Sequence, residues 1–371
     1  MDADVLQLRS SAGLYGADQA LLSLSAALPR QALRSRLLSI RNYRMPRQEL
    51  HEAACQRGID AALLPCHGRI DPATVRALRS ECAAAPHAIV HAHDYKSTVY
   101  AWLATRNLGR PLVSTLHGWI ETSAGLRLYK RVELGLLRAF DALVVVSDTQ
   151  RETLHRAGIR EERIHWIANG IDTQRYSPST PAASRTEFGI GASAFLFGCV
   201  ARLAPEKNLA ALVDTLAVLR GDGADVALLL VGDGPERTRL AELANHAGVA
   251  DGVHFAGALD DTSRIYPMLD AFVLPSLTEG MPLAVLEAMA SERPIVASAV
   301  GEIPPLLRGT QYGRLVRAGD RADLLQAMRA ALAAGRVRDT SARQRVESAY
   351  SIEHAAAAYA SLYRKLARRP A

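Results

Sequence analysis

The sequence predicts an α/β fold with two Rossmann-like domains, each built on a parallel sheet. Short apolar runs alternate with amphipathic stretches, a rhythm typical of parallel strands connected by helices. The chain has 371 residues, which suits about two domains at roughly 100–200 residues each. The apolar runs are also too numerous for one compact sheet.

The apolar runs form two sets, separated by a segment rich in turn-forming residues. We interpret as buried strands the runs 3–8, 87–93, 111–117 and 141–147 in the first set and 195–201, 226–232, 253–257, 271–276 and 294–298 in the second. Between the sets, Asn169-Gly170 is a turn signal, and Pro178 and Pro181 lie among Ser and Thr. We therefore expect a first domain over 1–172 and a second over 173–350.

Two stretches have a clear helical pattern. In 207–219, leucines fall on one face at helical spacing, and Asn208 is the expected N-cap. In 351–369, apolar residues form one stripe and the last residues are basic. This stretch predicts an amphipathic terminal helix.

The composition excludes several classes of protein. With 49% hydrophobic and 22% charged residues, the chain is neither disordered nor fibrous. No run approaches 18 apolar residues, so we expect no transmembrane helix. The first residues lack a basic-then-apolar signal pattern, and the four cysteines form no C-x-x-C pair. We therefore expect a cytoplasmic protein.

The formal net charge of +6 lies entirely in the first half of the chain. Residues 1–175 hold 23 Lys and Arg against 17 Asp and Glu, whereas residues 176–371 are neutral. The excess is concentrated between Arg30 and Arg47, a stretch without an acid. Two interpretations stay open: an ordinary solvated surface, or contact with an anionic membrane surface. No nucleic-acid motif accompanies the basic stretch, so we expect no nucleic-acid partner.

In the second domain, charged side chains follow two strand ends. In open α/β sheets, ligands bind beyond the carboxyl ends of the strands. Arg202 and Lys207 follow one strand there, and two cations beside a helix N-terminus suit a diphosphate. After another strand, Glu279 precedes a helix start, and Glu287 comes two helical turns later. These carboxylates suit sugar hydroxyls, and backbone amides between 280 and 283 suit an anion.

The first domain adds smaller signals. Gly13 and Gly16 join a strand to a helix but lack the full G-x-G-x-x-G fingerprint, which argues against a nicotinamide dehydrogenase. His91 and His93 share a strand face, yet no third ligand follows at a convincing spacing, so we predict no metal site. His117 stands at a strand end, where it could reach a reacting sugar.

Taken together, these residues resemble the large family 4 of retaining nucleotide-sugar glycosyltransferases. That family has the GT-B fold, in which two Rossmann-like domains face a central cleft. The matching segments are, in chain order, GLYGAD, HAHD, TLHG, VVVSDTQ, NGID, GCVARLAPEKN, LLLVGDGPER, VHFAG and TEGMPLAVLEAMA. They span about residues 13–300, and the spacing of Glu279 and Glu287 is the most specific of them.

For the second domain, the resemblance implies a donor site. Arg202 and Lys207 would hold the donor diphosphate, Glu279 would bind hydroxyls of the transferred sugar, and Glu287 would bind the donor ribose. The segment that would contact the sugar and phosphate comprises Gly280, Met281, Pro282 and Leu283.

For the first domain, the resemblance implies an acceptor site. Gly16 would line the phosphate, His117 would lie beside the transferred sugar, and Asp94 and Asn169 would lie near the cleft. The terminal stretch 351–371 would pack back on this domain. The loop departs from the family pattern at Tyr15, where a second glycine is usual.

The implied reaction is the retaining transfer of a hexose from a nucleotide diphosphate sugar, and a UDP-sugar is the favoured donor. The acceptor would be a saccharide or a lipid-linked acceptor of envelope or exopolysaccharide biosynthesis. No cofactor or metal is expected, because Arg202, Lys207 and helix amides would stabilise the leaving diphosphate and the only D-x-D is Asp2-Ala3-Asp4. The enzyme would visit the inner face of the cytoplasmic membrane. Two alternatives stay open: a nucleotide-sugar 2-epimerase of the same fold, and a catalytically silent GT-B partner subunit.

Overall fold

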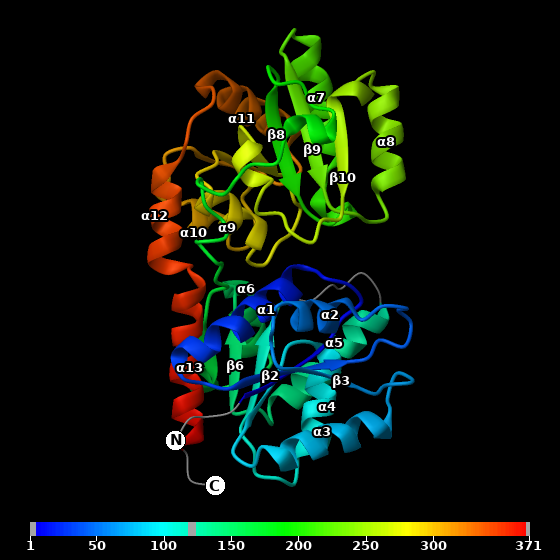
Figure 1. The fold of residues 1–371 in the computed structure, drawn as a ribbon, viewed down its shortest axis with the longest axis vertical. Helices are drawn as coiled ribbons and strands as arrows, with labels where there is room; N and C mark the ends of the chain where they lie inside the picture. Colours follow the sequence, from blue (N-terminus) through cyan, green and yellow to red (C-terminus); the bar gives the residue numbers. More distant parts are fainter. Residues whose placement is uncertain (1–4, 118–123, 369–371) are drawn as a thin grey trace. The chain divides into compact units, whose positions relative to one another are not determined.

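The computed structural model describes residues 5–117 and 124–368 and consists of two compact units. Unit 1 comprises Met1–Gly170 together with Ile352–Ala371, and unit 2 comprises Ile171–Ser351. Each unit is a parallel sheet with helices on both faces (Figure 1). The predicted fold class, two Rossmann-like parallel-sheet domains, is therefore confirmed.

Unit 1 contains a seven-stranded parallel sheet in the order β3-β2-β1-β4-β5-β6-β7. Its strands are β1 (Val5–Ser10), β2 (Ser35–Ile40), β3 (Ala61–Leu64), β4 (Ile89–Ala92), β5 (Leu112–Leu116), β6 (Ala142–Val145) and β7 (Ile164–Trp166). Its helices are α1 (Gly16–Ala27), α2 (Glu49–Gln56), α3 (Pro72–Ala84), α4 (Tyr95–Thr105), α5 (Ala124–Leu137), α6 (Asp148–Arg156) and α13 (Ile352–Ala367).

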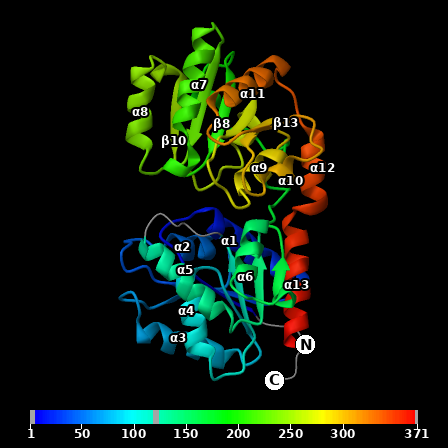
Figure 2. The same ribbon diagram turned by 180° about the vertical axis from the view of Figure 1, so that it is seen from behind.

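The helices of unit 1 cover the two faces of its sheet because successive strand residues point to opposite sides. In β4, for example, Val90 packs in a core with α3 and α4, whereas Ile89 packs in a core with α1 and α13. The two views in Figures 1 and 2 show α13 alongside α1. The terminal stretch is thus an amphipathic helix as predicted, with Ile352, Tyr359 and Tyr363 on its buried side.

Unit 2 contains a six-stranded parallel sheet in the order β10-β9-β8-β11-β12-β13. Its strands are β8 (Phe195–Val200), β9 (Val226–Val231), β10 (Val253–Gly257), β11 (Ala271–Leu274), β12 (Ile295–Ser298) and β13 (Gly313–Val316). Its helices are α7 (Ala210–Gly221), α8 (Arg237–His246), α9 (Leu283–Ala290), α10 (Ile303–Leu307), α11 (Arg321–Ala334) and α12 (Thr340–Ala349). Short 3₁₀ turns occur at Leu28–Gln31, Glu161–Arg163, Arg185–Phe188, Pro205–Lys207, Ala250–Gly252 and Tyr266–Met268.

All nine predicted strands are present, but one predicted cap is wrong. Asn208 adopts the left-handed conformation, with φ of 52°, and ends the short turn Pro205–Lys207. Leu209 occupies the N-cap position of α7 instead. Asparagine tolerates this conformation better than most residues, which explains its place between the turn and the helix.

In each sheet, the strand order reverses at one point. The reversal lies between β1 and β4 in unit 1 and between β8 and β11 in unit 2. Chain connections leave the sheet in opposite directions there, and ligands of open α/β sheets bind beside the carboxyl ends of those strands. Within the described residues, no helix combines the length and the apolar character needed to cross a membrane.

Candidate functional site

In unit 2, the loops after β8 and β11 bring two of the predicted site residues into direct contact. The ammonium Nζ of Lys207 lies 2.6 Å from Oε1 of Glu279. The hydroxyl of Ser276 donates to the same oxygen at 2.7 Å. The two charged side chains are 19% and 8% exposed, so this ion pair is well shielded but reachable. It lies at the strand-order reversal, where the fold favours a ligand.

Arg202 is held at the same edge, but by a different carboxylate. Its guanidinium forms an ion pair of 2.5 Å with Glu206, one turn further along the loop. The loop after β8 is bound to the loop after β11, because the amide of Leu277 donates to the carbonyl oxygen of Glu206 at 2.8 Å. Both predicted cations are thus paired with carboxylates. Neither Glu206 nor Ser276 was singled out from the sequence.

Two glycines allow the neighbouring backbone to support these loops. A Cβ on Gly234, whose φ is +158°, would lie 2.4 Å from the carbonyl oxygen of Leu203. A Cβ on Gly301, whose φ is +53°, would lie 2.3 Å from the carbonyl oxygen of Glu279. Because only glycine permits such close approach, the loop after β12 packs directly on the segment that carries Glu279.

Glu287 lies on α9, in a cluster separate from the Lys207–Glu279 pair. It is 8% exposed, and Oε2 accepts a hydrogen bond from the hydroxyl of Tyr266. Burial raises the pKa of Glu287, while hydrogen bonds from Tyr266 and Tyr176 oppose that rise. Arg175 adds a nearby positive charge. The structure therefore places Glu287 in a polar pocket of aromatic hydroxyls, which the sequence did not reveal.

The segment between the two glutamates forms the entrance to α9. Pro282 is the N-cap residue and Leu283 begins the helix. Met281 is buried, and Gly280 accepts a hydrogen bond at its carbonyl from the amide of Glu302, at 2.9 Å. The predicted turn into a helix is present. Pro282 lies one position before the first helical residue, Leu283, and not at the first helical position, where proline is favoured. The positive end of the α9 dipole consequently lies beside Glu279.

In unit 1, the strand-order reversal carries a buried ion pair that the sequence analysis missed. Arg9, on β1, pairs with Asp18 at 2.5 Å and donates to the carbonyl oxygen of His93 at 2.6 Å. Asp94 accepts from the amide of Ser10 at 2.7 Å and caps α4. These bonds tie the end of β1 to the end of β4, and they give Asp94 a structural role.

Gly16 begins α1 at this edge and has open space around it. Nothing lies within 4 Å of a Cβ built on it. Tyr15, by contrast, covers Gly13, because a Cβ on Gly13 would lie 2.8 Å from the tyrosine ring. The unusual tyrosine of this loop is 49% exposed. It folds over Gly13 and leaves Gly16 accessible.

Because a methyl group at position 16 would meet no protein atom, a Gly16→Ala variant can distinguish a role in ligand binding from a role in the fold. We expect Gly16→Ala to leave the melting temperature unchanged or slightly higher, since alanine is the better helix former by about 1 kcal/mol. If the backbone here approaches a phosphate, the added methyl group should weaken binding of nucleotide sugars. Calorimetric titration and a thermal melt of the same variant test both points. Unchanged affinity would remove Gly16 from the site.

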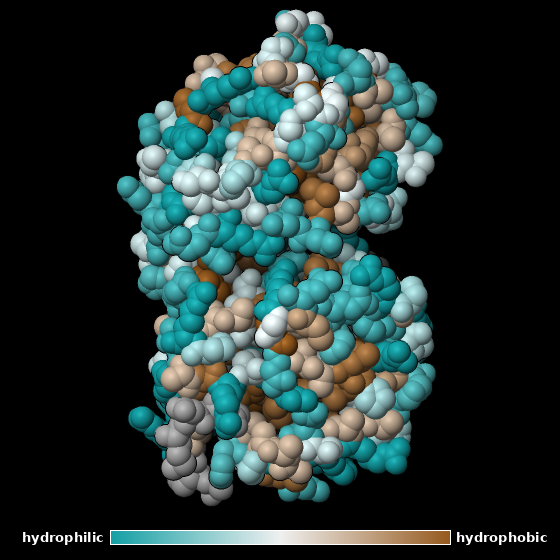
Figure 3. All heavy atoms as spheres, viewed as in Figure 1, coloured by the Kyte–Doolittle hydropathy of each residue, from teal (hydrophilic) through white to brown (hydrophobic). Residues whose placement is uncertain are grey.

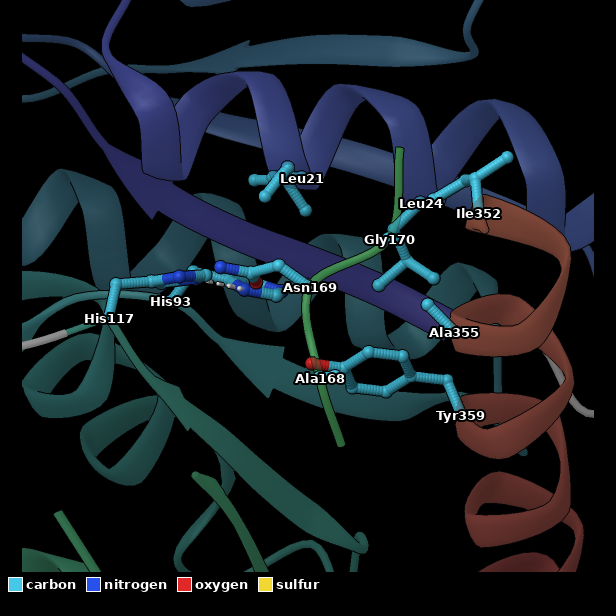
Figure 4. A pocket seen from close by; sticks show the side chains of 11 residues that line it. Leu21, Leu24, His93, His117, Ala168, Asn169, Gly170, Ile352, Ala355 and Tyr359 are labelled. Atoms are coloured by element: carbon cyan, nitrogen blue, oxygen red, sulfur yellow. Dashed lines mark hydrogen bonds between the residues drawn. The ribbon is translucent and has the colours of Figure 1, made fainter. Parts of the chain in front are cut away.

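A hollow in unit 1 is lined by two further predicted site residues, His117 and Asn169. His93, His117 and Asn169 line it together with apolar residues of α1 and α13. Figure 4 shows the two imidazoles side by side, with Asn169 next to them and Tyr359 facing the hollow from α13. Nδ1 of His93 lies 3.3 Å from Nε2 of His117. The structure therefore brings His117 and Asn169 together.

Among the described residues, no group of three or more His, Cys, Asp or Glu side chains could hold a metal ion. The rings of His91 and His93 are tilted by 38° with their centroids 4.0 Å apart, and their ring nitrogens hydrogen-bond to protein groups. The Asp2-Ala3-Asp4 motif lies outside the described residues.

Comparisons with known proteins match both units. The family described as Glycosyltransferase Family 4 matches residues 15–175, and the family described as Glycosyl transferases group 1 matches residues 194–334. A D-inositol 3-phosphate glycosyltransferase from Actinosynnema mirum is 31% identical over 308 residues, covering 75% of this chain and 72% of the relative. A glycogen synthase from Mycobacterium tuberculosis is 31% identical over 291 residues, covering 74% and 68%.

A third relative matches over a smaller share of the chain. EpsF of Bacillus subtilis (strain 168), whose name marks it as a candidate glycosyltransferase, is 31% identical over 245 residues. The match covers 63% of this chain and 64% of EpsF, so the chain spans a little under two thirds of that relative.

Solved structures show the same fold. Anabaena Alr3699/HepE, in complex with UDP and glucose, superposes with a TM-score of 0.82 at 21% identity, covering 96% of this chain and 98% of that one. Sucrose-phosphate synthase from Thermosynechococcus elongatus gives a TM-score of 0.79 at 21% identity, covering 98% and 99%. With its two matched units, its relatives and its GT-B architecture, the chain belongs to glycosyltransferase family 4.

Proposed function

We propose that this protein is a retaining, metal-independent glycosyltransferase that moves a hexose from a UDP-sugar to a saccharide or lipid-linked acceptor. The Lys207–Glu279 ion pair at the strand-order reversal of unit 2 is the observation that carries this proposal. A lysine held there by a carboxylate can exchange that carboxylate for a phosphate. The exchange frees Glu279 to accept hydrogen bonds from sugar hydroxyls.

The proposed chemistry requires stabilisation of a leaving diphosphate. Negative charge develops on the diphosphate as the bond to the anomeric carbon breaks. Lys207, Arg202 and the amides at the start of α9 lie where they can meet that charge. Both cations first exchange their carboxylate partners for the diphosphate, and the loops after β8 and β11 then hold them beside it. No nucleophile of the chain is assigned.

Named relatives support the choice of donor and setting. Alr3699/HepE was solved with UDP and glucose, which favours a uridine diphosphate sugar here. The likeness to EpsF favours exopolysaccharide or envelope biosynthesis. The 2-epimerase alternative shares the fold but would release a free sugar without any acceptor. The silent-subunit alternative would leave the donor unchanged.

We expect transfer to persist in excess EDTA, because the two cations and the helix amides supply the positive charge that a metal supplies elsewhere. A panel of nucleotide sugars, ranked by the rise in melting temperature that binding produces, identifies the donor. Acceptor-dependent release of nucleoside diphosphate from that donor is then measured with EDTA and with added magnesium. Complete loss in EDTA, restored by magnesium, would contradict the proposed mechanism.

We also propose that the protein works at the cytoplasmic face of a membrane, where a lipid-linked acceptor would lie. The arginines between 30 and 47 do not form one free patch. Arg30 pairs with Glu353, and Arg36 pairs with Asp60 and Glu81 at the opposite end of β2 from the site. Over unit 1, Figure 3 shows hydrophilic residues interspersed with apolar ones.

The part of the basic stretch that remains suited to an anionic surface lies beyond the carboxyl end of β2. Arg41 and Arg44 are exposed there, and both Arg44 and Lys96 lie over the exposed ring of Tyr43, at 5.6 and 5.7 Å. Cations and an aromatic ring together favour the interface of an anionic leaflet. This edge of the sheet also carries Gly16, so an acceptor held there would lie at the same edge of unit 1 as the loop that is expected to line the phosphate.

Vesicle co-sedimentation tests this membrane proposal. We expect binding to vesicles with anionic lipid at low salt, worth about 1 kcal/mol for each basic residue near the surface, and a steep fall at physiological salt. Charge reversal at Arg41 and Arg44 should abolish it, whereas reversal at the distant Arg156, on α6, should not. Equal recovery with neutral vesicles would favour a soluble acceptor.

A further inference from the structure

Unit 1 contains a continuous chain of buried hydrogen bonds that ends on His117. Nδ1 of His93 faces Nε2 of His117 at 3.3 Å, and Nε2 of His93 lies 2.6 Å from Oε1 of Gln7. Gln7 in turn donates from Nε2 to the hydroxyl of Tyr363, on α13, at 3.3 Å. That hydroxyl lies 2.6 Å from Nδ1 of His91. The chain thus connects β1, β4, β5 and the terminal helix.

The orientation of Gln7 determines which ring nitrogens carry protons. Because Oε1 of Gln7 only accepts, Nε2 of His93 must carry a proton. In a neutral imidazole, Nδ1 of His93 is then an acceptor, and it faces Nε2 of His117. Nε2 of His117 must therefore donate, which leaves Nδ1 of His117 without a proton.

We propose that Gln7 and His93 are positioning residues that hold His117 in the tautomer with a proton on Nε2, so that Nδ1 is free to accept a hydrogen bond from a hydroxyl of the sugar. This inference rests on the proposed function for its substrate, but the tautomer itself is a property of the free protein. It gives Gln7 and His93 a role that no motif of the sequence assigned to them.

The surroundings keep this chain uncharged. Burial lowers the pKa of His91 to about 3, and it lowers the pKa values of His93 and His117 well below their usual range. Arg9 adds to the effect on His93 and His117. The titratable groups packed around the chain are Arg9 on β1, Asp18 on α1, His91 on β4, Asp94 at the start of α4, and Tyr359 and Tyr363 on α13.

A carboxylate in place of Gln7 would stabilise a positively charged imidazolium, which the neutral amide of Gln7 does not do. In the described part of the chain, the ring nitrogens of the three imidazoles hydrogen-bond to neutral groups: an amide, hydroxyls or another imidazole. Asp18, a buried acid of the same region, is paired with Arg9. A glutamine accepts a hydrogen bond without stabilising an imidazolium. It therefore fixes the tautomer and keeps His117 neutral at the same time.

The test reads the ring nitrogens of His117 directly, by long-range ¹H–¹⁵N NMR of histidine-labelled protein. In the wild type we expect a protonated Nε2, an unprotonated Nδ1, and no titration between about pH 5 and 8, where an unperturbed histidine changes charge. A protonated Nδ1 would overturn the proposal without any variant. This readout needs no donor, so it stands apart from the proposed function.

Two variants of Gln7 then separate positioning from packing. Gln7→Leu should give His117 a mixture of tautomers. It should lower kcat about tenfold and leave the donor KM unchanged. Tenfold is the lower end of the loss seen when the hydrogen-bond partner of a metal-bound histidine is removed. Gln7→Glu should keep the tautomer but introduce a titration of the histidine pair and a matching pH dependence of kcat. An unchanged His117 spectrum in Gln7→Leu would refute the role.

Gln150→Leu is the matched control. Gln150 is also a buried glutamine of unit 1, 3% exposed, and its Oε1 accepts from the backbone amide of Val146 at 2.9 Å. Its loss should cost similar stability without altering the ring nitrogens of His117. Equal spectral changes in both variants would show a general loosening of unit 1 and would overturn the assignment. If wild type transfers no sugar yet shows the expected tautomer, only the proposed function fails.

Discussion

Lys207→Ala should lower kcat/KM for sugar transfer by about 30- to 1000-fold, which corresponds to roughly 2–4 kcal/mol of lost charge stabilisation. The reason is that Lys207 lies at the strand-order reversal, 2.6 Å from Glu279, where the leaving diphosphate would replace the carboxylate. The fold should survive, since the lysine is at an accessible edge and Ser276 still donates to Glu279. Steady-state kinetics and a thermal melt measure the two effects.

Arg317→Ala is the matched control for this variant. Arg317 is a cation at the end of β13, on the same edge of the sheet, and it is paired with Asp320 and Asp323. It lies two strands beyond β11 and lines a hollow with Asn208 and Pro275, so it is a cation close to the Lys207–Glu279 pair that is bound to other carboxylates. We expect Arg317→Ala to transfer sugar at the wild-type rate. Equal losses in both variants, or none in Lys207→Ala, would remove the diphosphate role.

Glu279→Ala should lower kcat/KM by about 10- to 100-fold, since hydrogen bonds to a charged group contribute roughly 1.5–3 kcal/mol. Affinity for free UDP should not fall, because the variant releases Lys207 from its carboxylate and leaves it available to phosphate. A fall in turnover without a fall in UDP affinity distinguishes this role from a general disturbance. Kinetics with the true donor and calorimetry with UDP measure them separately.

Glu236→Ala is the corresponding carboxylate control. Glu236 follows β9 on the same edge of unit 2 and pairs with Arg239 at 2.6 Å. Its removal should leave both turnover and UDP affinity unchanged. A fall in UDP affinity for Glu279→Ala would mean that the glutamate supports the nucleotide rather than the sugar.

The nine predicted strands were recognisable because they are largely apolar, and eight of them are interior strands of their sheets, whereas β10 lies at an edge. The strands that the sequence did not reveal are β2, β3, β7 and β13. β7 and β13 are short edge strands, and β2 is flanked by arginines. In the structure, acids from distant segments, such as Glu81 beside Arg36, offset that charge. Local charge counting cannot anticipate such pairs, because they form only when the chain folds.

The sequence predicted those site residues that directly follow a strand end. It did not predict contacts between residues that come from separate segments of the chain. Lys207 and Glu279 were named separately, but their contact requires β8 and β11 to be adjacent, which no local pattern encodes. Tyr266, the partner of Glu287, comes from a 3₁₀ turn without a motif. Gln7 and Arg9 did carry a signal, as polar residues inside a buried strand, and the sequence analysis passed over it.

The measurement that tests the central claim most directly is the anomeric configuration of the product, followed by NMR as the wild-type protein consumes its nucleotide sugar in EDTA. We predict that a new glycosidic bond forms only when acceptor is present, and that its anomeric carbon keeps the configuration of the donor. An inverted product would contradict the retaining mechanism. A free or epimerised sugar released without acceptor would show that the site serves the epimerase reaction instead.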